Sequence, residues 1–430
     1  MKEKYLTNAR IIDPKNDMDE IGGLIIDSKG SIKAVGKKVA NGNLPSSADK
    51  IDLNKQILIP GLVDMRVFVG EPGYEYKENF RTLSNAALSG GVTSVVSMPN
   101  TSPTIDNVSM VDFLKRRGRD KSKINIFPAA TLTKNAEGMQ MTEFGLLKRK
   151  GIIAFTDGVK TVQDPQVMAR IMNFASQSES LVMQHAEDNI LSKDGLINEG
   201  EISTRLGLKG IPFLAEKIIV ERDLSFLEEY FCRYHISQIS SEKTVSVIKK
   251  AKKEGKIFTT GVSINNLSLN ENDIGDFKTF LKLSPPLRTE NDRLALVEAI
   301  SDGTIDVIVS DHKPQDEESK RLTFAQAATG ATGVETLLPL ALELFHNKSI
   351  RLKQLISTIT SNPAKILGIN KGSLDKGNDA DLCVFDINKP WIVDKETLKS
   401  KSKNTPIENR KLQGQVLKTF VKGELSYQNI

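Results

Sequence analysis

Residues 57–73, ILIPGLVDMRVFVGEPG, contain a strand-like apolar run that leads into a polar, glycine- and proline-containing turn. The start of this stretch is almost entirely apolar, which is typical of a strand that is covered on both faces. The same kind of run recurs along the middle of the chain and is often followed by a polar residue. The eight runs span residues 57–65, 92–99, 124–130, 151–157, 181–187, 234–240, 256–262 and 305–311.

Amphipathic helical segments alternate with these runs. Residues 108–119, 164–177, 242–255 and 291–303 carry apolar side chains at helical spacing, with charged residues on the opposite face. Eight strand-and-helix units over roughly 310 residues predict an α/β fold of the (β/α)8 TIM barrel type with insertions. A doubly wound open sheet is the alternative, but neither a G-x-G-x-x-G nor a Walker sequence supports it.

The two ends of the chain have a different pattern. Short alternating runs separated by turn residues lie before the barrel and after it, which indicates small antiparallel strands. Since both ends are of this kind, we expect one composite β-sandwich domain made by both termini. The predicted division is residues 1–56 and 371–430 for this β domain and residues 57–370 for the barrel.

Composition excludes several classes of protein. The 430 residues include 59 basic and 54 acidic side chains spread along the chain, for a net charge of +5, which is no nucleic-acid footprint. No apolar run reaches the ~18 residues of a membrane span. The N-terminus shows no secretory signal, so we expect a cytoplasmic protein. Only four histidines occur: His185, His235, His312 and His346.

Polar residues at the ends of the eight runs are the candidates for a functional site. The strands of a barrel end at one mouth, where active sites of this fold lie. Any one of these residues could equally be a satisfied loop group. The candidates are Asp64, Arg66, Asn100, Asp157, His185, Glu187, His235, Gln238, Ser263, Asn265, Asp311 and His312.

Several long blocks, in order, resemble the dihydroorotases of the amidohydrolase superfamily. The stretch at residues 60–73 is similar to their first-strand pattern P-G-x-x-D-x-H-x-H-x-R-E-P-G, and further blocks follow at residues 77–106, 282–314 and 330–342. The resemblance implies a zinc site at the barrel mouth. Its ligands would be two first-strand histidines, histidines at the fifth and sixth strands and an aspartate at the eighth, with a carboxylated lysine or an aspartate between two metals.

Carried over residue by residue, the implied ligand set is incomplete. Arg66 and Phe68 occupy the two H-x-H positions, and Gln238 takes the sixth-strand histidine position. An arginine keeps its proton and a phenyl ring has no lone pair, so neither can bind zinc. His185 and Asp311 are retained, and Asp157 is a third candidate ligand. Two or three ligands are too few for a tight binuclear site.

The positions that would contact substrate are changed as well. Gly70 replaces the arginine that would receive a carboxylate, Gly158 replaces a second aspartate after Asp157, and Asn100 is kept. Further family positions hold other residues: Ser284, Gln315, Asn265 and Asn266. Both the metal ligands and the arginine that would bind the substrate carboxylate are lost, which indicates that the chain no longer catalyses the reaction. Asp311 and Asn100 are then remnants of the catalytic and substrate-binding residues.

The first hypothesis is therefore a non-catalytic dihydroorotase-like protein of de novo pyrimidine synthesis that needs no cofactor. The resemblance implies aspartate transcarbamoylase as its partner, and a homodimer is a further expectation. The second hypothesis is an active dihydroorotase or other cyclic amidohydrolase with a rearranged zinc site that uses His185 and Asp311. In either case Arg66 could pair with Asp311 or Asp157, or it could form an anion pocket.

Overall fold

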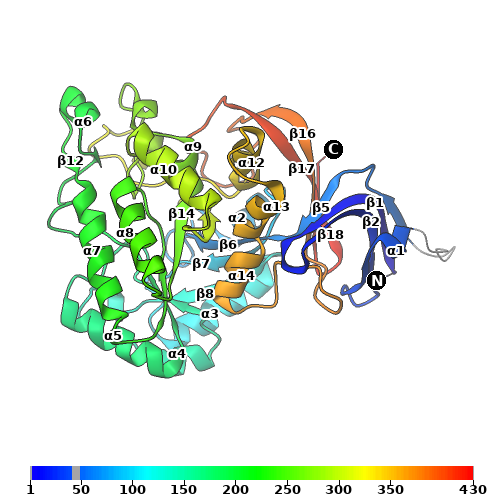
Figure 1. Ribbon diagram of the computed structural model, residues 1–430, viewed down its shortest axis with the longest axis horizontal. Coiled ribbons are helices and arrows are strands. Elements are labelled where there is room, and N and C mark those ends of the chain that lie inside the picture. Colours follow the sequence, from blue (N-terminus) through cyan, green and yellow to red (C-terminus); the bar gives the residue numbers. More distant parts are fainter. Residues whose placement is uncertain (1, 41–48, 430) are drawn as a thin grey trace.

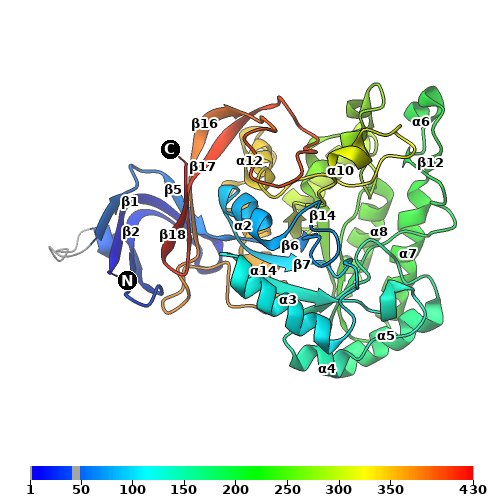
Figure 2. The same ribbon diagram turned by 180° about the vertical axis from the view of Figure 1, so that it is seen from behind.

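The protein consists of a barrel and a smaller β domain. The computed structural model describes residues 2–40 and 49–429. Helices surround the barrel, and the β domain lies at one side of it, where the chain starts and ends (Figure 1; from behind, Figure 2). No helix in the described part of the chain has the length and apolarity needed to cross a membrane.

Eight parallel strands form the barrel, as predicted. Their order around the sheet follows the sequence, and the first and last strands meet through a bridge between Val67 and His312, where the Phe68 amide donates to the His312 carbonyl at 2.9 Å. The strands are β6 (Leu62–Val67), β7 (Val92–Ser97), β8 (Asn125–Ala130), β9 (Ala154–Phe155), β10 (Leu181–Gln184), β13 (Arg233–Ile236), β14 (Thr259–Ser263) and β15 (Val307–Val309).

The four predicted helices form where their sequence signals lie. Asn107, Asp164, Ser241 and Thr289 precede them and accept hydrogen bonds from the first free backbone amides. These helices are α3 (Val108–Lys121), α5 (Pro165–Ser178), α8 (Glu242–Lys253) and α10 (Glu290–Ser301). The others are α1 (Lys37–Ala40), α2 (Phe80–Ser89), α4 (Phe144–Arg149), α6 (Glu201–Leu206), α7 (Phe213–Phe226), α9 (Ile264–Ser268), α11 (Glu317–Lys320), α12 (Leu337–His346), α13 (Leu352–Ile359) and α14 (Ser361–Leu367).

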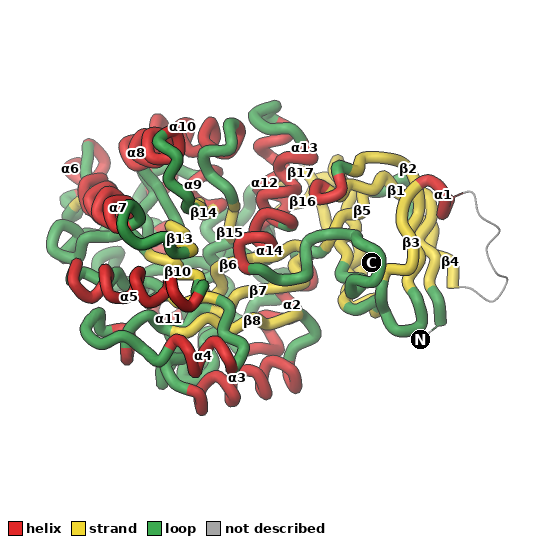
Figure 3. The backbone as a smooth tube through the Cα atoms, turned by 60° about the horizontal axis from the view of Figure 1, so that its bottom comes forward, coloured by secondary structure: helices red, strands yellow, loops and turns green. Residues whose placement is uncertain are grey.

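Both ends of the chain build one sheet, which confirms the composite β domain (Figure 3). Antiparallel pairing dominates this sheet, and its core contains apolar residues from both termini. Its strands are β1 (Lys4–Asp13), β2 (Met18–Ile26), β3 (Ile32–Gly36), β4 (Asp49–Asp52), β5 (Ile57–Pro60), β16 (Leu382–Ile392), β17 (Lys411–Val421) and β18 (Glu424–Gln428). A separate short pair, β11 (Ile197–Asn198) and β12 (Gly210–Ile211), lies outside both sheets.

The predicted barrel start at residue 57 is corrected by this pairing. Strand β5, Ile57–Pro60, pairs with β1 and β16 in the terminal sheet. The barrel therefore begins at β6 with Leu62. The two strands form one apolar run in the sequence because both are fully buried, so hydropathy alone does not separate them.

Apolar side chains fill the barrel below its mouth. Val63, Met65, Val96, Met183 and Val309 belong to one buried cluster. This filling closes the interior, so the polar residues at the strand ends lie on top of a packed core.

Candidate functional site

An ion pair joins the two ends of the barrel sheet at its mouth. Arg66 on β6 donates through Nε to Asp311 Oδ1 at 3.0 Å, and the two residues are 1% and 6% exposed. Asp311 follows β15 and has a left-handed backbone with φ of +50°, a conformation that few residues other than glycine adopt. Of the two carboxylates predicted as partners of Arg66, the structure selects Asp311.

The Arg66 guanidinium makes further contacts in the same place. Its Nη1 donates to the Gly158 carbonyl at 3.2 Å, and its central carbon lies 5.3 Å from the centre of the Phe68 ring. Arg66 thus holds Asp311 and the β9 loop with two of its nitrogens. The expected anion pocket loses much of its donor capacity, because these groups are already bound to the protein.

Lys313 is a member of the site that the sequence analysis missed. Its Nζ lies 5.6 Å from the centre of the Phe68 ring. Burial, with the charge of Arg66 acting in the same direction, lowers the pKa of Lys313 to about 8. The only signal in the sequence is a lysine in DHKP where the family pattern D-H-A-P-H has alanine.

A pH-dependent stability follows from Lys313. Its pKa is about 8 in the folded chain and ~10.4 in an unfolded one. Between these values the unfolded state binds more protons, so the contribution of Lys313 to the free energy of unfolding rises with pH. Relative to Lys313→Met, wild type should gain stability from pH 8 upward in urea titrations. Lys376→Met, at an exposed lysine, is the control, and parallel pH curves for wild type and Lys313→Met would contradict the prediction.

His185, the one retained histidine ligand, belongs to no group of three or more described histidine, cysteine or acidic side chains that could hold a metal ion. Its Nε2 is 3.4 Å from Ser284 Oγ, and its Nδ1 has no hydrogen-bond partner within the described residues. Burial first, and then the charges of Arg66 and Lys313, lower the pKa of His185 to about 3. The ring is therefore neutral at physiological pH.

Asp157 and Asn100 are both held by hydrogen bonds to loops that follow the barrel strands. Both Asp157 carboxylate oxygens accept hydrogen bonds from Thr133, one from the backbone amide at 3.0 Å and one from the hydroxyl at 2.6 Å. Asn100 Nδ2 donates to the Asp157 carbonyl at 3.0 Å. Among residues 2–40 and 49–429, Asp157 forms no metal-holding group with His185 and Asp311, and its vestigial ligand role stays a prediction.

Two glycines explain why other family side chains are missing. Gly158 has φ of +68°, and a Cβ there would lie 1.5 Å from Asn100 Oδ1. Gly70 has φ of +75°, and a Cβ would lie 2.7 Å from the Glu78 carbonyl oxygen. At Gly70 the neighbouring backbone leaves no room for a side chain, whereas at Gly158 a side chain requires the Asn100 amide to move.

Three further candidates, His235, Gln238 and Asn266, are buried. His235 Nδ1 lies 2.8 Å from Thr259 Oγ1, and Asn266 Nδ2 donates to the Pro286 carbonyl at 3.0 Å. Burial raises the pKa of the Asp311 carboxyl. The charge of Arg66 and, more weakly, the buried Gln238 side chain lower that pKa in part. None of these contacts completes a reactive set.

Zinc does not fit these residues. Catalytic zinc sites use at least three nitrogen, sulfur or carboxylate ligands and leave one position open. Among residues 2–40 and 49–429, no group of three or more histidine, cysteine, aspartate or glutamate side chains is placed to hold a metal ion. The retained Asp311 carboxylate is already bound to Arg66, which carries the positive charge at this position.

Comparisons with known proteins identify the family. Residues 55–244 match the family described as dihydro-orotase-like, and residues 296–427 match the amidohydrolase family. A dihydroorotase of Ehrlichia canis is 42% identical, covering 98% of this chain and 94% of the relative, and one of Syntrophus aciditrophicus is 41% identical, covering 98% and 99%.

The solved structures give the fold independently. An L-hydantoinase (dihydropyrimidinase) from Arthrobacter aurescens superposes with a TM-score of 0.89 at 23% identity and covers 100% of this chain and 96% of its own. That identity supports the shared architecture alone. The sequence matches extend over nearly the whole chain, and the chain therefore belongs to the dihydroorotase family of the amidohydrolases.

Proposed function

We propose that this chain is a non-catalytic member of the dihydroorotase family. The observation that carries the proposal is the buried contact between Arg66 and Asp311 at the implied metal position. This ion pair occupies Asp311, the eighth-strand aspartate to which the family resemblance gives the catalytic proton transfer. Arg66 cannot replace a ligand or a base, because its guanidinium keeps its proton.

Two retained polar groups at the mouth, His185 and Asp157, are poor candidates for a base, whereas Lys313, with a pKa of about 8, lies near the range that a base needs. A general base works best with a pKa near the operating pH. The pKa of His185 is lowered to about 3, far below that range. The Asp157 carboxylate accepts two hydrogen bonds from Thr133.

A second candidate is an active dihydroorotase or related cyclic amidohydrolase with a rearranged zinc site. The names of the relatives favour it, since proteins 42% and 41% identical over almost the full chain are called dihydroorotase. Retained His185, Asn100 and Asp311 are the residues it would use. For this candidate to hold, Arg66 has to leave Asp311.

Metal content and turnover separate the two candidates. We expect the purified chain, loaded with zinc and then desalted, to retain far less than one zinc per chain. We also expect it to show no interconversion of carbamoyl aspartate and dihydroorotate above the rate without protein. The Syntrophus aciditrophicus relative, prepared in the same way, is the reference for both assays. One zinc per chain, with turnover that His185→Ala abolishes, would establish the enzyme instead.

For the non-catalytic chain we propose aspartate transcarbamoylase as the partner, in de novo pyrimidine synthesis. The support is the family resemblance combined with an intact barrel and β domain around a mouth that has lost its ligands. We expect the chain, mixed with the transcarbamoylase of its own organism, to elute as one complex in size-exclusion chromatography with light scattering. Separate elution, with transcarbamoylase activity unchanged from the enzyme alone, would refute the partnership.

A further inference from the structure

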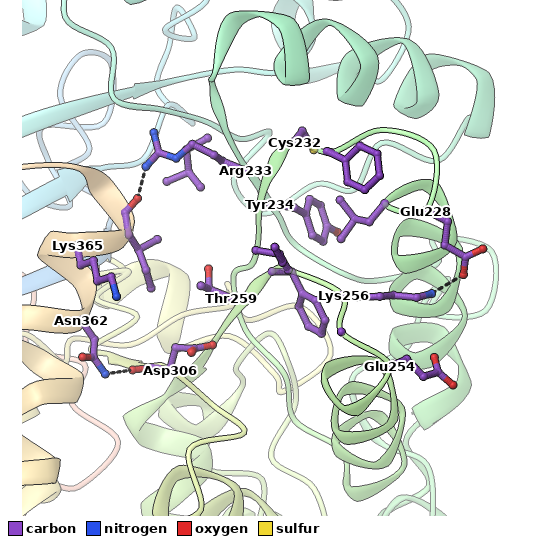
Figure 4. A pocket seen from close by; sticks show the side chains of 17 residues that line it. Glu228, Cys232, Arg233, Tyr234, Glu254, Lys256, Thr259, Asp306, Asn362 and Lys365 are labelled. Atoms are coloured by element: carbon purple, nitrogen blue, oxygen red, sulfur yellow. Dashed lines mark hydrogen bonds and ion pairs between the residues drawn. The ribbon is translucent and has the colours of Figure 1, made fainter.

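A cavity of about 890 Å³ lies at the end of the barrel opposite the mouth. Leu181, Arg233 and Thr259, the first residues of β10, β13 and β14, line it together with the loops that lead into β13 and β14. Figure 4 shows these side chains around the hollow. Thr259, the partner of His235, is the one residue of the site description that also lines the cavity, and Arg66, Asp311, His185 and Asp157 do not, so the cavity is separate from the mouth.

Two large apolar side chains stand in solvent at this cavity. Phe231 is 83% exposed and Ile257 is 89% exposed, and each lies on one of the two loops that line the hollow. Single exposed apolar residues are common, but two such side chains beside an apolar cavity are typical of a binding face.

The walls of the hollow match these protruding side chains. Leu227, Tyr234 and Phe258 are buried and contribute apolar surface to the cavity. The same face therefore carries apolar projections and an apolar recess. This combination is what a two-fold symmetric interface requires, since each copy offers the same patch to the other.

Charges on the face have the same complementarity. Lys365 and Arg233 lie on one side of the hollow with Asp306, whereas Glu228 and Glu254 lie on the opposite side with Lys256, so one side has an excess of positive charge and the other of negative charge (Figure 4). A two-fold axis between the two sides places Lys365 of one copy opposite the acidic side of the other. Glu228 binds Lys256 at 2.6 Å and Glu254 lies 3.9 Å from Lys250, so Glu254 is the acidic residue more available to a second copy.

We propose that this face is the interface of a homodimer in which Phe231 and Ile257 of each copy enter the other copy's hollow. The inference is independent of the proposed function, because neither the mouth nor its chemistry is involved. It gives the predicted homodimer a location at the N-terminal end of the barrel strands.

The apolar contact is tested by a double substitution. We expect wild type to elute with a mass twice the 47.4 kDa of one chain in size-exclusion chromatography with light scattering. Phe231→Ser with Ile257→Ser should raise the dimer dissociation constant about 100-fold or more, because four buried apolar side chains are lost per dimer. The matched control is Met139→Ser with Ile190→Ser, at side chains that are 74% and 80% exposed and follow β8 and β10.

A charge exchange tests the symmetry itself. Lys365→Glu alone should weaken the dimer, because like charges then face each other, and Lys365→Glu combined with Glu254→Lys should restore it. A wild-type monomer at all accessible concentrations overturns the proposal, and the face then serves another partner. The proposal is also overturned if the control substitutions at Met139 and Ile190 dissociate the dimer and those at Phe231 and Ile257 do not. If the Phe231 and Ile257 substitutions weaken the dimer but the combined Lys365 and Glu254 exchange does not restore it, the two-fold arrangement is wrong.

Discussion

Replacing Arg66 with methionine is expected to lower the free energy of unfolding by about 3–5 kcal/mol, as for a buried ion pair that loses one partner. Asp311, 6% exposed, would keep a buried charge without its partner, and the Gly158 carbonyl would lose a donor. Methionine keeps the apolar stem, so little packing is lost. Equilibrium unfolding in guanidinium chloride measures the change.

The double variant Arg66→Met with Asp311→Asn is the decisive control. Asparagine removes the charge and tolerates the left-handed backbone at position 311, where φ is +50°. We expect it to regain at least half of the lost stability, because no buried charge remains unpaired. Single and double variants that unfold at the same midpoint would show that the cost comes from packing. The ion-pair interpretation of the mouth would then be wrong.

Substituting Gly158 with alanine is expected to cost about 3 kcal/mol or more, since strain and a steric clash add. With φ of +68°, the position is unfavourable for any side chain, and a Cβ would lie 1.5 Å from Asn100 Oδ1. Relief would require Asn100 to move and to release the Asp157 carbonyl. Thermal and chemical unfolding of the variant measure the cost.

Gly138→Ala provides the matched control for this substitution. Gly138 has φ of +74°, close to that of Gly158, but its Cβ would meet nothing within 4 Å. Alanine there should cost only the backbone strain, about 1 kcal/mol. Equal losses at the two positions would mean that Asn100 moves freely, and the explanation of the missing second aspartate by steric exclusion would fail.

Local patterns predicted most of the fold. The eight strands and the helices at 108–119, 164–177, 242–255 and 291–303 form where apolar periodicity and capping residues indicate them. The exception is Ile57–Pro60, which joins the terminal sheet. Its assignment depends on pairing with β1 and β16, and no local pattern contains that information.

That Arg66, Phe68 and Gln238 stand at the implied ligand positions could be read from the amino acids, because the metal-binding capacity of a side chain is a property of the residue alone. That Arg66 binds Asp311, 245 residues away, and that Thr133 binds Asp157 became visible in the folded chain. Such choices depend on distances and burial at the mouth, and these arise only when the ends of separate strands are brought together.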